Sequence, residues 1–279
     1  MTAAKNSMLC PNCRRLISID EPACPYCGLS RPGSRKLSLF FSRFTAGFPD
    51  WVRTLIYANA VFFLLSIFLN PSSLGFTTNP IGLLAPSEGS LFLLGATGAI
   101  PVAQYGRWWT LISASFLHGG ILHIFFNMAA LWQLGPFVIR EFGASRFVLI
   151  YILAGIAGFY LSVLAGIPLT IGASASVCGL IGAILYYGKS RGGFYGEAIY
   201  RQAMSWIVGL VLFGLLIPGI NNWAHGGGVL AGILIAFAAG YQERRRETFF
   251  LQVLAGLCGL LTVVVLAWAV FQALYFLLR

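Results

Sequence analysis

Seven long apolar runs dominate this sequence and limit what the chain can fold into. They cover about 55–70, 109–134, 147–166, 173–188, 203–219, 224–240 and 249–277. Each approaches the length of roughly 20 residues that crosses the hydrocarbon core of a bilayer as an α-helix. Only 9% of the residues are charged and 58% are hydrophobic, which agrees with that interpretation. The sequence therefore predicts an all-α, multi-pass membrane protein, with a long loop carrying short interfacial helices at 71–108.

Positive charge is distributed unevenly between the segments that join these runs. If the N-terminus is cytoplasmic, 16 of the 18 Lys and Arg residues lie on the cytoplasmic side. Their segments are 1–54, 135–146, 189–202 and 241–248. This distribution follows the positive-inside rule, and the basic surface suits anionic lipid headgroups. Topology explains the net charge of +10, so we expect a lipid bilayer around the chain and no nucleic-acid partner.

Polar residues inside the apolar runs gather at one depth. His123 and Asn127 share one helix face near the start of the second run, because they are four residues apart. Ser174 lies in the first turn of the fourth run, within "IGASASVCGLIG", and His225 lies near the start of the sixth. All four should lie in the outer half of the membrane, where ionisable groups are costly and usually functional.

These residue types can carry out acyl transfer. A serine hydroxyl needs a base to become a nucleophile, and His225 is at the right depth to serve Ser174. No acidic residue is nearby to orient the imidazole, so backbone or polar side chains would have to do so. His123, Asn127 and the backbone N–H of Ser174 at a helix N-terminus could stabilise an oxyanion. Gly172 lets the chain turn closely before the serine.

Each of these residues, taken alone, also fits a structural role, and only the three motifs together favour catalysis. A serine in a membrane helix usually packs and bonds back to a carbonyl, and a histidine can relay protons. The "GGGVLAG" segment contains Gly228 and Gly232, a G-x-x-x-G pair typical of close helix packing. The order His-x3-Asn, Gly-x-Ser and Ala-His-x2-Gly, each at the outer end of its own helix, favours catalysis.

Three segments together resemble one family, the rhomboid intramembrane serine proteases. "FLHGGILHIFFNMAALWQLG" is similar to the family's second helix, "GASASVCGLIGA" to its nucleophile helix and "NWAHGGGVLAG" to its histidine helix. The resemblance covers about 53–240 and implies a rhomboid-like six-helix core with a water-filled cavity, followed by one C-terminal helix. It implies that Ser174 is the nucleophile and His225 the base, with His123, Asn127 and Ser174 at the oxyanion. Structural roles are implied for His118, Gly172, Gly228 and Gly232.

Three positions depart from the family pattern. Ala175 follows the serine where Gly is common, and Cys178 stands where the family often has Tyr or Phe against the histidine ring. The Trp-Arg pair of the family's first loop is Trp109-Thr110 here. None of these changes removes a reacting group.

The resemblance implies a serine endopeptidase that cleaves transmembrane or juxtamembrane segments of membrane proteins and needs no cofactor for catalysis. A membrane helix hides its carbonyls in its own hydrogen bonds, so we expect substrates with Gly or Pro near the cut. The alternative is a catalytically inactive rhomboid-like factor that binds or escorts membrane proteins. A transporter with a histidine proton relay is disfavoured because the predicted core helices contain no Asp or Glu.

The N-terminal segment "CPNCRRLISIDEPACPYCG" contains a separate motif. Cys10, Cys13, Cys24 and Cys27 form C-x2-C-x10-C-x2-C, a spacing typical of a structural zinc ribbon. A disulfide or a metal-free tail is the alternative, but thiols stay reduced in the cytoplasm. A ribbon on the cytoplasmic side could bind a cytoplasmic partner. The motif also suggests that the protein lies in a prokaryotic inner membrane. The predicted domains are a ribbon at 1–34, a basic linker at 35–52, the rhomboid core at 53–240 and a loop with the seventh helix at 241–279.

Overall fold

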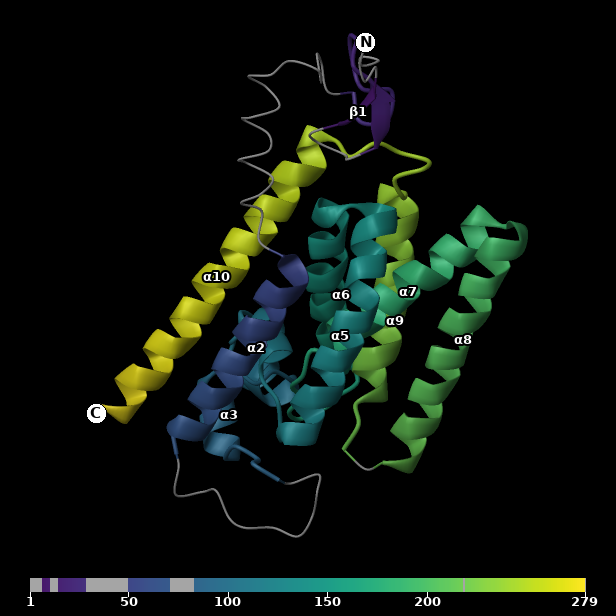
Figure 1. Cartoon of the computed structure of the whole chain (residues 1–279). Coiled ribbons are helices and arrows are strands. Elements are labelled where there is room, and N and C mark those ends of the chain that lie inside the picture. Colours follow the sequence, from purple (N-terminus) through teal and green to yellow (C-terminus); the bar gives the residue numbers. More distant parts are fainter. Residues whose placement is uncertain (1–6, 11–14, 29–49, 71–82, 218, 279) are drawn as a thin grey trace. The chain divides into compact units, whose positions relative to one another are not determined.

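A computed structural model describes residues 7–10, 15–28, 50–70, 83–217 and 219–278 (Figure 1). The chain divides into two compact units, 1–51 and 52–279. The smaller unit contains an antiparallel hairpin of β1 (Ser7–Leu9) and β2 (Leu16–Ser18), in which Met8 pairs with Ile17. Ile17, Cys10 and Cys24 are its buried residues.

The larger unit is helical. Its long helices are α2 (Trp51–Phe68), α5 (Ile121–Phe142), α6 (Ala144–Leu164), α7 (Ser174–Arg191), α8 (Gly193–Leu216), α9 (Asn222–Ala239) and α10 (Phe249–Leu277). Among the described residues, six helices are long and apolar enough to cross a membrane: α2, α5, α6, α8, α9 and α10. The prediction of an all-α polytopic membrane protein is confirmed.

Helix α7 lies among the other long helices and differs from them (Figure 1). It packs against α5, α6, α8 and α9, and twelve of its 18 residues are buried. It carries two serines in its first turn and two basic residues in its last, so it is less apolar than its neighbours. Because protein rather than lipid surrounds it, those polar groups are tolerated.

Glycines bring the backbones of α7 and α9 into contact. A Cβ atom at Gly228 would collide with the Ala175 carbonyl oxygen, and one at Gly232 with the Gly179 carbonyl oxygen. In a bilayer, helices associate through close packing and polar contacts, since lipid tails are as apolar as leucine. Gly228 and Gly232 therefore have the packing role that the G-x-x-x-G spacing indicates.

The second predicted span, 109–134, is wrong in its boundaries. The structure divides it into α4 (Thr110–Ser113), the 3-10 helix η4 (Ala114–Phe116), an irregular segment and then α5. Ser113 Oγ donates to the Gly95 carbonyl, so the first part packs inside the protein. Hydropathy cannot distinguish a buried apolar segment from one that faces lipid.

The loop predicted at 135–146 is also wrong. Helix α5 continues through Pro136 to Phe142, and only Gly143 separates it from α6. Similarly, Gly192 alone separates α7 from α8. Glu141 and Glu197 therefore lie in helices, contrary to the expectation of core helices without acidic residues. The described part of the 71–108 loop contains the expected short helices, α3 (Glu88–Leu93) and the π-helix η3 (Ile100–Gln104).

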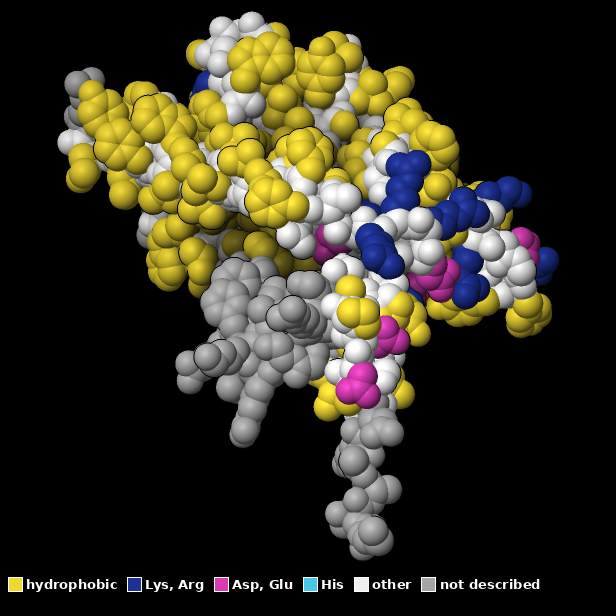
Figure 2. All heavy atoms as spheres, turned by 90° about the horizontal axis from the view of Figure 1, so that it is seen from above, with side chains coloured by type: hydrophobic (Ala, Val, Ile, Leu, Met, Phe, Trp, Pro, Cys, Tyr) yellow, Lys and Arg dark blue, Asp and Glu magenta, His cyan; other side chains and the backbone are white. Residues whose placement is uncertain are grey.

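Basic side chains gather at the end of the bundle where α5 and α7 finish (Figure 2). The exposed members include Arg140, Lys189, Arg191, Arg201 and Arg244. Their location at one end agrees with the sequence-based grouping of charge.

Arg146 belongs to the same end of the bundle but is fully buried. Its guanidinium donates to the carbonyls of Phe142 (2.9 Å), Ala239 (3.2 Å), Arg245 (2.9 Å) and Arg246 (3.0 Å). These carbonyls include the last turns of α5 and α9, where a cation is favoured by the helix dipole. Arg146 thus ties the ends of two helices to the segment that leads into α10.

We predict that Arg146→Met lowers the free energy of unfolding by about 2–4 kcal/mol, because buried carbonyls lose a charged donor. Denaturant titration in detergent micelles measures this change. Arg201→Met is the matched control, since its exposed ion pair with Glu197 contributes at most about 1 kcal/mol. Equal effects of the two variants would contradict the structural role of Arg146.

Candidate active site

Ser174 and His225 meet at the start of two helices. Ser174 is the first residue of α7, and His225 lies in the first turn of α9. Ser174 Oγ is 2.9 Å from His225 Nε2, which is hydrogen-bond distance. The direct contact of the α7 and α9 backbones allows this approach. A neutral imidazole with its free electron pair on Nε2 can accept the serine proton.

The other nitrogen of His225 has no orienting group. Nδ1 is buried and forms no hydrogen bond with any residue that the structure describes. The expectation of a backbone or polar group at this position is therefore not met among those residues. The ring depends instead on the packing of α9 against α7, where Gly228 faces the Cβ atom of Cys178.

Asn221 fastens the start of α9. Its side-chain oxygen accepts from the Ala224 backbone N–H at 3.1 Å and caps the helix. Its amide nitrogen donates to Ser162 Oγ at 2.8 Å and to Thr170 Oγ1 at 3.0 Å. Asn221 therefore links the helix of His225 to α6 and to the segment before Ser174. Asn221 is not among the site residues predicted from sequence, although its capping position before "NWAH" could have indicated it.

The segment before Ser174 is held by hydrogen bonds on both sides. Thr170 pairs with Thr97 through two backbone hydrogen bonds of 2.6 and 3.1 Å. Gly172 N–H donates to the Ala114 carbonyl at 2.8 Å. The Ala173 N–H donates to Nε2 of the fully buried His118 at 3.5 Å, which is long for such a bond. These contacts orient the first turn of α7.

The position of Gly172 requires a glycine for two reasons, its backbone conformation and the lack of space for a Cβ atom. Its φ of +121° lies in a region that L-residues with a Cβ atom avoid. A Cβ atom here would also lie 2.7 Å from His123 Nε2, so the ring could not keep its place. Gly172 thus brings the imidazole of His123 next to the serine turn.

His123 and Asn127 lie on one face of α5, as their spacing predicts. His123 Nδ1 accepts from the Gly119 N–H at 3.3 Å, which puts the ring proton on Nε2, facing the serine turn. Asn127 Nδ2 donates to the His123 carbonyl at 2.8 Å, leaving its second N–H for another acceptor. The His123 Nε2–H can therefore donate to an acceptor beside the serine turn.

The first loop is anchored by Arg107, not by the position after Trp109. The Arg107 guanidinium donates to the Phe92 and Leu93 carbonyls and lies 4.7 Å from the centres of the Phe92 and Trp109 rings. Burial lowers the pKa of Arg107, but a guanidinium stays charged at neutral pH. Thr110 Oγ1 donates to the Arg107 carbonyl at 2.7 Å, so the Thr110 departure is accommodated.

A cleft of about 390 Å³ opens between α8 and α9 beside His225. Its lining is apolar apart from His225 and Asn222. Little of α8 is buried: only Gly196 and Ala203 of this 24-residue helix are buried. An apolar segment can therefore approach the histidine from this side.

The small unit contains a second candidate site. The thiols of Cys10, Cys24 and Cys27 lie within 4.8 Å of one another, and those of Cys10 and Cys27 are 3.6 Å apart. Tetrahedral zinc with Zn–S bonds near 2.3 Å separates its sulfurs by about 3.8 Å, so these residues fit that ion. Burial alone would raise the pKa of the Cys24 thiol, but hydrogen bonds from the backbone of Cys27 and Tyr26 lower it to about 7. Cys13 lies outside the described residues.

The large unit is thus a polytopic helical membrane protein with a Ser–His pair at the ends of two closely packed helices. Comparison with known proteins agrees: the Rhomboid domain profile matches residues 105–242. The putative rhomboid protease YdcA of Bacillus subtilis is 31% identical over 144 residues, which are 50% of this chain and 72% of that protein. The chain belongs to the rhomboid family.

Two longer relatives are also similar. Rhomboid protease GluP of Bacillus subtilis is 36% identical over 151 residues, which are 54% of this chain and 30% of GluP. RHOMBOID-like protein 4 of Arabidopsis thaliana is 32% identical over 215 residues, which are 70% of this chain and 53% of that protein. The chain therefore spans less than two thirds of these relatives.

We predict that Gly172→Ala slows the reaction of Ser174 with a fluorophosphonate at least about tenfold, because the added methyl group displaces His123. The labelling rate of the purified protein measures this. Gly166→Ala is the matched control, since Gly166 also has a positive φ (+74°) but an added Cβ meets nothing within 4 Å. Equal slowing in both variants would mean that backbone strain, and not contact with His123, is responsible.

Proposed function

We propose that this protein is an intramembrane serine endopeptidase that cleaves transmembrane or juxtamembrane segments of membrane proteins. The observation that carries the proposal is the 2.9 Å separation of Ser174 Oγ and His225 Nε2. Its relatives include two proteins named as rhomboid proteases, one of them putative. The presence of both reacting groups disfavours the alternative of an inactive binding factor.

The chemistry proceeds in two halves. His225 Nε2 takes the Ser174 proton as Oγ attacks the scissile carbonyl, and the carbonyl oxygen becomes an oxyanion. When the C–N bond breaks, His225 gives the proton to the leaving nitrogen, and Ser174 remains acylated. His225 then removes a proton from water as the water oxygen attacks the ester carbonyl. The acyl C–Oγ bond breaks, His225 returns the proton to Ser174 Oγ, and the acyl half leaves as a carboxylic acid.

Three donors would stabilise the oxyanion. They are His123 Nε2–H, the second N–H of Asn127 and the backbone N–H of Ser174, which lies in the first turn of α7 where helix N–H groups lack intrahelical partners. The helix dipole favours negative charge at the same place. Since Asn127 already donates to the His123 carbonyl, its second N–H has a fixed direction.

The cleft between α8 and α9 suits an apolar substrate segment. Such a segment would reach His225 without crossing the polar end of the bundle. The substrate must unwind locally before its carbonyl can be attacked, because a helix uses those oxygens internally. Gly or Pro near the cut lowers the free energy of that unwinding.

The charge distribution supports a location for this activity. With the basic end of the bundle in the cytoplasm, the starts of α7 and α9 lie toward the outer face. We propose this orientation, in the inner membrane of a prokaryote.

We also propose that Cys10, Cys13, Cys24 and Cys27 hold a structural zinc ion. The support is the C-x2-C-x10-C-x2-C spacing and the clustering of three of the thiols within 4.8 Å. A hairpin of this size has too small a hydrophobic core to fold without a bound metal ion. The folded ribbon would offer a surface to a cytoplasmic partner.

We predict that a fluorophosphonate labels the parent protein and not Ser174→Ala, and that His225→Ala lowers the labelling rate by about 10²–10⁴-fold. Mass spectrometry of the labelled peptide identifies the serine. Ser190→Ala, at the other end of α7, is the control and should label like the parent.

Labelling that persists in Ser174→Ala would show that another residue is the nucleophile. Absence of label from a folded parent would favour the inactive binding factor.

We predict one zinc ion per chain, reduced to less than about a tenth in Cys24→Ser, because a structural site needs all four thiolate ligands. Elemental analysis of the purified full chain measures the metal. Cys258→Ser, a change in α10, is the control and should keep its zinc. A zinc-free parent with disulfide-linked N-terminal cysteines would contradict the proposal.

A further inference from the structure

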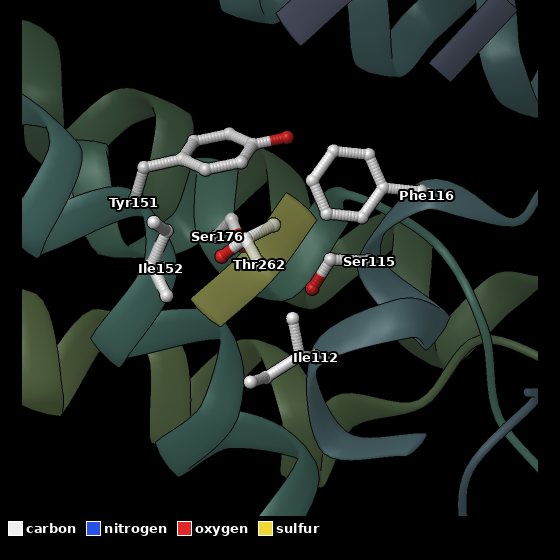
Figure 3. A pocket seen from close by; sticks show the side chains of 7 residues that line it. All are labelled: Ile112, Ser115, Phe116, Tyr151, Ile152, Ser176 and Thr262. Carbon is white, nitrogen blue, oxygen red and sulfur yellow. The ribbon is translucent and has the colours of Figure 1, made fainter. Parts of the chain in front are cut away.

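A small cavity lies on the side of α7 that faces α6 and α10 (Figure 3). Its lining comes from α4, η4, α6, α7 and α10: Ile112, Ser115, Phe116, Tyr151, Ile152, Ser176 and Thr262. Ser176 is two residues beyond Ser174, but the cavity is separate from the Ser174–His225 contact, which faces α9. Four of the seven lining side chains carry hydroxyl groups.

Two of these hydroxyls are buried without a partner. Within the part of the chain that the structure describes, Ser176 Oγ and the Tyr151 hydroxyl form no hydrogen bond of ordinary geometry. The Tyr151 hydroxyl also interacts with the side chain of Asn59, whose oxygen forms no hydrogen bond with the described residues either. Thr262 Oγ1 donates to the Cys258 carbonyl at 2.8 Å and keeps its electron pairs for a donor. Buried polar groups are rarely left in this state.

The volume of the cavity suits one small polar molecule. It measures about 10 Å³, close to the space that a single water molecule occupies by the same measure. Gly155 on α6 leaves room for the Ser176 hydroxyl itself, because a Cβ atom there would collide with Ser176 Oγ and lie 3.0 Å from Ser115 Oγ. A cavity with several hydroxyls and room for one water is the kind that holds water, whereas an apolar cavity stays empty.

We propose that this cavity binds a single structural water molecule that joins α10 to the helix of Ser174. The water accepts from Ser176 Oγ and donates to Thr262 Oγ1, and Tyr151 and Ser115 are its further partners. Within Phe249–Leu277, which the structure describes throughout, Thr262 is the one polar residue among those buried; the others are Ala255, Val265, Ala269 and Ala273.

The water would therefore give α10 a polar contact with a defined position, and α10 has no other buried polar residue that could provide one. Helices in lipid gain little from apolar burial against one another, so a polar bridge fixes which face of α10 docks. The seventh helix would be held to the catalytic helix at one point, through a bound molecule rather than a direct side-chain contact.

The sign of a stability change tests this proposal. If water is bound, Ser176→Ala and Tyr151→Phe remove its partners, and each should lower the melting temperature in detergent by about 2–4 °C. If the cavity is dry, each change removes an unsatisfied buried hydroxyl and should raise the melting temperature. An unchanged or raised melting temperature overturns the proposal. Ser190→Ala is the matched control on the same helix.

A double-mutant cycle tests the bridge itself. Ser176→Ala and Thr262→Val share one water, so their combined lowering of the melting temperature should be smaller than the sum of the two. The pair Ser176→Ala and Thr54→Val should be additive, because Thr54 is exposed on α2. Additivity in both pairs overturns the bridge.

A high-resolution experimental map of the parent protein needs no variant to fold. The expected result is a density peak within hydrogen-bond distance of Ser176 Oγ and Thr262 Oγ1; an empty cavity in a map that resolves other buried waters overturns the proposal. None of these readouts involves proteolysis, so they do not depend on the role of Ser174.

Discussion

The backbone contact between α7 and α9 is the interaction on which the candidate site depends. Gly228 and Gly232 let the two helices approach until carbonyl oxygens of α7 occupy the space of the missing side chains. The Ser174–His225 distance of 2.9 Å follows from that approach, because each residue begins its own helix. A larger residue at either glycine would separate the helices and, with them, the reacting atoms.

Packing also replaces an orienting partner for the histidine. With Nδ1 of His225 unpartnered among the described residues, the ring is placed by the α9 backbone. Asn221 strengthens this arrangement, since it caps α9 and bonds to Ser162 and Thr170 at the same time. The polar contacts of Asn221 thus hold the start of α9 in place, and the start of α9 determines where His225 lies.

Sequence reasoning located the helices and the residues near the candidate site because both depend on local patterns. Each predicted apolar run overlaps one of the seven long helices described, although the second run begins before α5 and α7 is not among the six helices apolar enough to cross a membrane. The predicted topology put Ser174, His123, Asn127 and His225 at one depth. Contacts between residues far apart in the chain could not be predicted from the sequence. The burial of Arg146 and the role of Asn221 arise from partners far along the chain.

The arrangement of Ser174, His225 and His123 is tested most directly by an experimental structure of the protein after reaction with a fluorophosphonate, whose phosphoryl oxygen stands in for the oxyanion. We predict a covalent bond to Ser174 Oγ, with that oxygen within hydrogen-bond distance of His123 Nε2 and the Ser174 backbone N–H. An adduct on another residue would show that Ser174 is not the nucleophile, and an oxygen that points away from His123 would show that His123 does not bind the oxyanion.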